Sequence, residues 1–138
     1  MAGKAVSGPQ GPHRFSQTLG QATQADAQSL LAIMQIVHQE PLATAFADLQ
    51  VGKVRTADAL KLAHLFEEIG ALTIHQLVNR DLLFDAYAFD SYWASLKSTV
   101  TRSRKATKNP KFGENFELLA EMAADYRQQR PPKSAAAA

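Results

Sequence analysis

One histidine and two glutamates lie close enough in the sequence to form a chemical site. His64, Glu67 and Glu68 are separated by three and four residues, so a helix would place the three side chains beside one another. An imidazole next to carboxylates can bind a metal ion or transfer a proton. His75 could add a further ligand, although we expect a break in the helix between it and the other three.

The same spacing also fits the outer face of an amphipathic helix. When Leu62, Phe66 and Ile69 face inward, His64 and both glutamates lie on the opposite, solvated side. The sequence has no H-E-x-x-H spacing, no Gly-rich phosphate loop after a strand and no cysteine. We therefore predict no catalytic residue, no bound metal and no cofactor, and we interpret the protein as a non-enzyme.

Glu67 has a second structural use, because it borders the buried side of its helix. A half-buried carboxylate of this kind can hold an arginine and fix the position of a neighbouring helix. We predict a structural ion pair between Glu67 and Arg104, with Arg80 and Arg102 as alternative partners.

A run of positive charge follows the aromatic segment of the chain. Residues 91–113 contain no Asp or Glu. Their cations are Lys97, Arg102, Arg104, Lys105, Lys108 and Lys111. These six side chains are candidate contacts to an anion or to nucleic acid, with Tyr92, Trp93 or Phe112 as possible stacking partners. The alternative is that they complement the dipole at a helix C-terminus, by about 0.3–1 kcal/mol each.

Helical periodicity covers almost the whole central part of the sequence. Helices are expected over residues 25–39, 42–50, 57–69, 80–89, 92–104 and 112–127. Thr56, Asn79 and Asp90 or Ser91 are expected to begin three of them, and Gly70 is expected to end the third, before a link over residues 71–78. The aromatic residues from Phe84 onward fall at helical spacing and are interpreted as core. The predicted fold is all-α.

The composition of the chain and the positions of its Gly and Pro residues indicate where the folded domain begins and ends. The chain has 138 residues, of which 46% are hydrophobic and 20% charged, which suits one compact helical bundle of about five to six helices. Gly, Pro, Ser and Gln predict a flexible N-terminal arm over residues 1–21, and two prolines predict a flexible tail over residues 128–138, around a helical domain of residues 22–127. Without a signal peptide or a long apolar run, we expect no membrane insertion and a cytoplasmic location.

Charge is distributed unevenly between the two parts of the chain. Up to Asp90 there are six Lys or Arg against nine Asp or Glu, and after it nine against four. The C-terminal third is therefore basic, although the net charge is only +2.

Several short sequence motifs follow one another over residues 66–122. They read FExIGxL, YWxxL, a following arginine, and NPxxxENFExLAE. They include Phe66, Glu67, Ile69, Gly70, Leu72, Tyr92, Trp93, Leu96, Arg104, Asn109, Pro110, Glu114, Asn115, Phe116, Glu117, Leu119 and Ala120. In this pattern the chain resembles a bacterial domain-of-unknown-function family of small helical proteins, departing from it at Thr73, Ile74 and Ser98. The resemblance implies a helical fold and supplies no catalytic residue.

Two functions from different classes are compatible with these features. The first is a protein–protein interaction or regulatory module that pairs with itself, as a homo-oligomer, or with another chain, because apolar helix surface is abundant. The alternative is a nucleic-acid-binding module that uses the basic residues 97–111.

Overall fold

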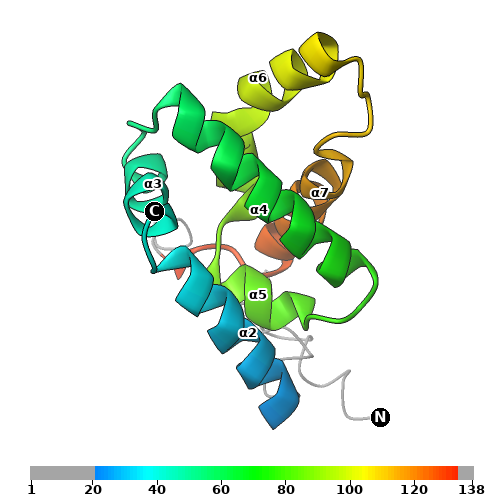
Figure 1. Cartoon of the computed structure of the whole chain (residues 1–138). Helices are drawn as coiled ribbons and strands as arrows, with labels where there is room; N and C mark the ends of the chain where they lie inside the picture. Colours follow the sequence, from blue (N-terminus) through cyan, green and yellow to red (C-terminus); the bar gives the residue numbers. More distant parts are fainter. Residues whose placement is uncertain (1–20, 134–138) are drawn as a thin grey trace.

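A computed structural model of the chain describes residues 21–133, which form six helices and no strand (Figure 1). The helices are α2 (Gln24–Val37), α3 (Leu42–Gln50), α4 (Thr56–Ile74), α5 (Arg80–Ala86), α6 (Phe89–Thr107) and α7 (Glu114–Gln129). The predicted all-α bundle is thereby confirmed. Most of the predicted arm (residues 1–20) and the end of the predicted tail (residues 134–138) lie outside the described residues.

Local sequence signals explain where several helices begin. The Thr23 hydroxyl accepts a hydrogen bond from the Asp26 backbone N–H, and the Asp26 carboxylate accepts one from the Thr23 N–H, which together form a capping box before α2. Asn79 begins α5 as predicted, because its side-chain oxygen accepts from the Leu82 N–H. Between residues 42 and 50 the predicted and observed helix boundaries coincide.

The prediction that α4 ends at Gly70 is wrong, since the helix continues to Ile74. Gly70 is buried where α4 crosses α7, and a Cβ at this position would lie 2.5 Å from the backbone oxygen of Asn115. The glycine therefore permits close packing of two helices instead of ending one of them. The predicted link shortens accordingly, and its turn places Gln76 at a φ of 63°.

Several further helix boundaries differ from the expected ones, and α5 ends at Ala86 instead of Phe89 because Tyr87 has an extended backbone. Thr56 is the first residue of α4 and Arg55 occupies its N-cap. Helix α6 begins at Phe89, after Ala88, so neither Asp90 nor Ser91 caps it. Helix α7 extends to Gln129, so residues 128 and 129 of the predicted tail are helical. Differences of one or two residues are common at helix ends, which fray.

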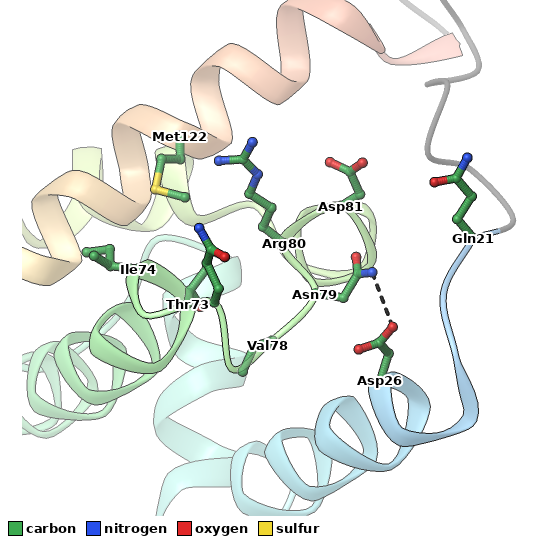
Figure 2. A pocket seen from close by; sticks show the side chains of 10 residues that line it. Gln21, Asp26, Thr73, Ile74, Val78, Asn79, Arg80, Asp81 and Met122 are labelled. Atoms are coloured by element: carbon green, nitrogen blue, oxygen red, sulfur yellow. Dashed lines mark hydrogen bonds between the residues drawn. The ribbon is translucent and has the colours of Figure 1, made fainter. Parts of the chain in front are cut away.

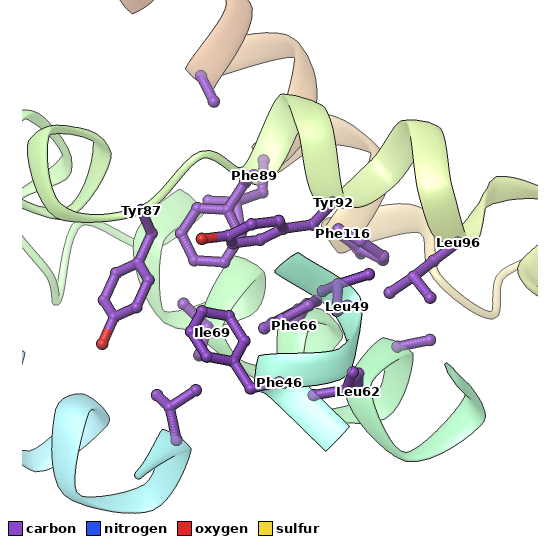
Figure 3. Packing of buried hydrophobic residues seen from close by; sticks show 14 of the residues in the cluster. Phe46, Leu49, Leu62, Phe66, Ile69, Tyr87, Phe89, Tyr92, Leu96 and Phe116 are labelled. Atoms are coloured by element: carbon purple, nitrogen blue, oxygen red, sulfur yellow. The ribbon is translucent and has the colours of Figure 1, made fainter. Parts of the chain in front are cut away.

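The core is centred on Phe66 of α4, which is 1% exposed. Its ring contacts the rings of Phe46, Phe89, Tyr92 and Phe116 at centroid distances of 5.3–6.5 Å, and these residues come from α3, α6 and α7 (Figure 3). Most of these pairs are edge-to-face or tilted, as aromatic rings prefer. The aromatic residues are thus core residues, as predicted. Helix α4 packs against α3, α6 and α7, whereas α2 packs against α3 and α5.

No helix within residues 21–133 combines the length and the apolar character needed to cross a membrane.

Candidate functional site

The histidines and glutamates considered as a metal or acid–base site do not come together. His64 is exposed and its ring lies 4.8 Å from the ring of Phe112. Glu68 is exposed on α4, and His75 is an exposed C-cap residue at the end of the same helix. In the part of the chain that the structure describes, no three His, Asp or Glu side chains are close enough to hold a metal ion.

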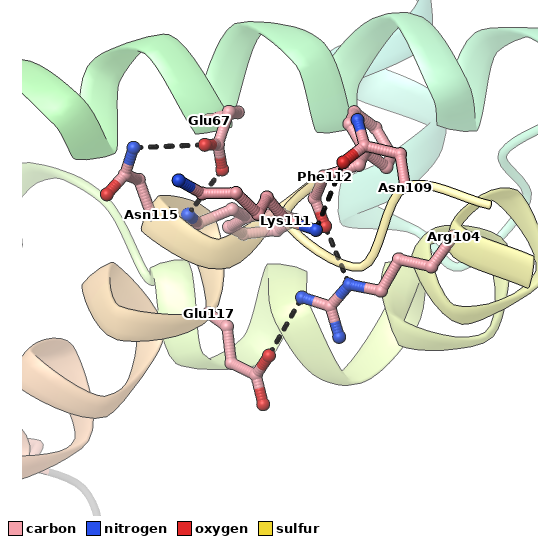
Figure 4. Close-up of polar contacts among 8 residues, drawn as sticks. Glu67, Arg104, Asn109, Lys111, Phe112, Asn115 and Glu117 are labelled. Atoms are coloured by element: carbon pink, nitrogen blue, oxygen red, sulfur yellow. Dashed lines mark hydrogen bonds and ion pairs between the residues drawn. The ribbon is translucent and has the colours of Figure 1, made fainter. Parts of the chain in front are cut away.

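Glu67 is engaged with the beginning of α7. One carboxylate oxygen accepts from the Phe116 backbone N–H at 2.9 Å, and the other accepts from the Asn115 side-chain amide at 3.0 Å (Figure 4). The N-cap residue of α7 is Gly113, at a φ of 78°, which has no side chain to satisfy the first N–H groups. Glu67 therefore provides, from a different helix, the capping oxygen that the local sequence lacks.

The predicted ion pair between Glu67 and Arg104 is corrected by these contacts. Arg104 donates to the Phe112 carbonyl at 2.6 Å and pairs with Glu117 at 2.9 Å (Figure 4). Its guanidinium also lies 5.9 Å from the ring centroid of Trp93. The physical reason lies at the end of α6. Arg104 in its last turn reaches the loop before α7 and the first turn of α7, whereas Glu67 already accepts from the Phe116 backbone N–H and the Asn115 side-chain amide.

Five of the six predicted cations have exposed side chains between the middle of α6 and the loop that follows it. They are Lys97, Arg102, Lys105, Lys108 and Lys111. Three of these surround a shallow hollow of about 470 Å³ on α6 itself, which we call the basic hollow. It is lined by Ala94, Lys97, Ser98, Thr101, Arg102 and Lys105. Arg104 does not belong to it, because its guanidinium is held against Trp93 and Glu117.

The aromatic residues suggested as stacking partners for bases are engaged in packing. Tyr92 is buried in the core, and Trp93 meets Phe116 edge-on at 5.0 Å. Phe112 faces His64 across 4.8 Å. The surface around the basic hollow therefore presents charge without a free aromatic platform.

Helix α2 buries little of its apolar surface. Of its 14 residues, only Ile33 and Val37 are buried. Leu31 is 54% exposed and Ile36 is 46% exposed. In Figure 1 the N-terminal half of α2 extends beyond the other labelled helices.

A hollow of about 630 Å³ lies where α2 begins, α4 ends and α5 begins (Figure 2). Its wall carries Asp26, Asn79, Arg80 and Asp81, with Met122 of α7 on the far side. The Asn79 amide donates to Asp26 at 3.3 Å and so ties α2 to α5. The Thr23 backbone N–H, helped by the Thr23 hydroxyl and Asn79, lowers the pKa of Asp26 against the opposing effect of desolvation.

One functional contact was missed by sequence reasoning although a signal for it exists. The segment GENFE starts α7 without Ser, Thr, Asp or Asn at its N-cap position. A helix start that lacks its own cap predicts a cap from elsewhere in the fold. Glu67 is that cap, 49 residues away from Phe116.

Comparisons of the chain with known protein families, with curated proteins and with solved structures found no match. The resemblance of residues 66–122 to a bacterial family therefore stays a prediction.

Proposed function

We propose that the protein is a non-enzymatic helical interaction module of the cytoplasm, and that α2 is the element that pairs with another protein chain. The supporting observation is the excess of apolar surface on α2. Successive residues of a helix are about 100° apart around its axis. Seen along the axis of α2, apolar side chains occupy an arc of about 220°, from Ile36 through Ile33 and Met34 to Leu31. Packing against one domain needs a stripe of about 100°.

A second copy of the chain is the partner that best fits this surface. Asp26 is the only charged side chain of α2, so two copies could pack their α2 helices together without bringing other like charges into contact. The exposed Leu31 and Ile36 lie on the two flanks of the buried stripe, where a neighbouring helix would cover them. Apolar side chains at such spacing are the anchors used in helix–helix recognition.

The oligomeric state in solution tests this proposal. We expect light scattering after size exclusion to give a mass that rises from one chain toward two as the concentration increases. The double variant Leu31→Glu and Ile36→Glu should remain a monomer, because it places charges in the apolar contact, while its melting temperature stays close to that of the parent.

The matched control carries the same change on other helices. Leu72 and Leu118 are 44% and 40% exposed on α4 and α7, so replacing both by glutamate adds equal charge at similar exposure. This control should self-associate like the parent. A parent protein that stays monomeric at every concentration would refute self-pairing through α2.

A further inference from the structure

The basic hollow on α6 has features that the proposed pairing through α2 does not use. Its three cations have long side chains, while Ala94, Ser98 and Thr101 between them are small. The small residues leave space that the long ones enclose. A compact anionic group placed there would be within reach of lysine and arginine donors.

The hollow faces away from the core. On α6 the fully buried positions are Phe89, Leu96 and Val100, and at about 100° per residue Thr101 and Lys105 point to the opposite side of the helix. The three cations are exposed. They can therefore meet a large partner without any rearrangement of the fold.

The positive charge of the hollow is not compensated within the described chain. The ion pairs formed by residues 21–133 use Arg55, Arg104 and Arg130, and none uses Lys97, Arg102 or Lys105. Residues 91–113 contain no acid at all. An external polyanion would therefore meet these cations without displacing an internal partner.

We propose that the basic hollow binds the phosphate backbone of a duplex nucleic acid. Lys97 and Lys105 are eight residues apart, which is about 12 Å along a helix. This span is close to the width of the major groove of B-form DNA, about 12 Å, so that one helix face can contact phosphates on both sides of the groove. Release of the counterions condensed on the duplex drives such binding.

Two other polyanions fit the surface less well. A membrane-binding helix needs exposed apolar side chains beside its cations. The large exposed apolar residues of the described chain all lie outside α6, and a single one of them, Leu60 of α4, lines a hollow with Arg102. A single-stranded nucleic acid is held largely by stacking on aromatic rings. Around α6 those rings are occupied, because Trp93 packs on Phe116 and Phe112 packs on His64.

The number of phosphate contacts sets the salt dependence. Three contacts, from Lys97, Arg102 and Lys105, predict that log K falls with log salt with a slope of about −2.7. Lys108 and Lys111 are exposed beyond the hollow, and a slope of about −4.5 would show that they also take part. Base sequence should have little effect, since no side chain of the hollow is placed to read base edges.

Fluorescence anisotropy with a labelled DNA duplex of about 20 base pairs tests the proposal in the full-length chain. For three contacts, we expect the association constant to fall about 40-fold between about 50 and 200 mM salt. The triple variant Lys97→Gln, Arg102→Gln and Lys105→Gln should bind at least about tenfold more weakly at the lower salt concentration. Because all three side chains are exposed, its helical circular dichroism and melting temperature should match the parent.

A control variant with the same loss of charge distinguishes binding at the basic hollow from a general effect of net charge on binding. Lys53, Arg80 and Lys133 are exposed and lie outside α6, and their replacement by glutamine should leave binding within about twofold. Equal losses in both triple variants would overturn the proposal, as would the absence of binding at about 50 mM salt. Tighter binding of single-stranded DNA, of polyglutamate or of anionic vesicles than of the duplex would overturn the assignment to a duplex.

Discussion

Glu67 shows how one side chain can resemble a reactive group and serve the fold instead. Its position beside His64 and Glu68 suits acid–base chemistry, yet both of its carboxylate oxygens accept hydrogen bonds from the start of α7. A carboxylate at this end of a helix also interacts favourably with the helix dipole. The side chain thereby links α4 to α7, two helices that meet in the centre of the bundle (Figure 1).

The capping role of Glu67 predicts a loss of stability when its carboxylate is removed. Glu67→Ala leaves the Phe116 N–H without its partner, and we expect the free energy of unfolding in urea to fall by about 1–2 kcal/mol. Glu67→Gln should lose less, because its amide oxygen can still accept from that N–H. The neighbouring Glu68 is exposed, so Glu68→Ala should change stability by less than about 0.5 kcal/mol. Equal effects of the two alanine variants would contradict the capping role.

Sequence reasoning found that Glu67 is structural but chose the wrong partner for it. The choice of Arg104 used charge complementarity alone, and no sequence signal placed the start of α7 beside the middle of α4. Arg104 instead bonds to Phe112 and Glu117, which are close to it along the chain. Which partner a charged side chain finds depends on where the fold places it. The exposure of His64, in contrast, followed from the helical spacing of the apolar residues around it.

At the level of helices, local signals predict some boundaries correctly and others not. Asn79 caps α5 as its residue type predicts, and α3 has the predicted limits. Gly70 misled the prediction for α4 because a glycine that ends a helix and a glycine that admits a neighbouring backbone look the same in a sequence. The difference lies in α7, whose residue Asn115 approaches that glycine.

The close approach at Gly70 predicts an unusual effect of alanine. In an open helical position, Gly→Ala stabilises by about 0.5–1 kcal/mol. Here the new Cβ would lie 2.5 Å from the Asn115 backbone oxygen, so α7 must shift, and we expect chemical denaturation to show a net loss of about 1–3 kcal/mol.

Two further variants separate this packing effect from helix propensity. Gly70→Ser should lose at least as much stability as Gly70→Ala, because its side chain is larger. Ala71→Gly, at the adjacent half-buried position, should lose about 1 kcal/mol through propensity alone. An increase in stability for Gly70→Ala would show that α4 and α7 do not pack as closely as described.

Across the whole molecule, one aromatic core and an uneven charge distribution are the dominant features. Both follow from the sequence, since the aromatic residues recur at helical spacing and the acids stop after Asp90 until Glu114. The direction in which the cationic side chains of α6 point did not follow from the sequence. The packing of Leu96 and Val100 into the core directs Lys97, Arg102 and Lys105 outward. Arg104 is not among these outward-facing cations, because it contacts Phe112 and Glu117.

The core also contains every tyrosine of the chain, Tyr87, Tyr92 and Tyr126. Burial raises the pKa of all three phenols above the ordinary value of 10.0. For Tyr126 the Asp85 carboxylate, which accepts its hydroxyl hydrogen bond at 3.2 Å, raises the pKa further. Since an unfolded chain would release these protons near pH 10, the folded state holds more protons above that pH.

Alkaline titration should therefore unfold the protein and ionise its tyrosines together. The contribution of the three phenols to stability is complete below pH 10, and it is lost as the pH rises through their higher folded pKa values. We expect the tyrosinate absorbance and the loss of helical circular dichroism to follow one cooperative transition above pH 10. In concentrated urea the same tyrosines should ionise near their ordinary pKa. A tyrosine that ionises near pH 10 while the helical signal is intact would show that the core around it is open to water.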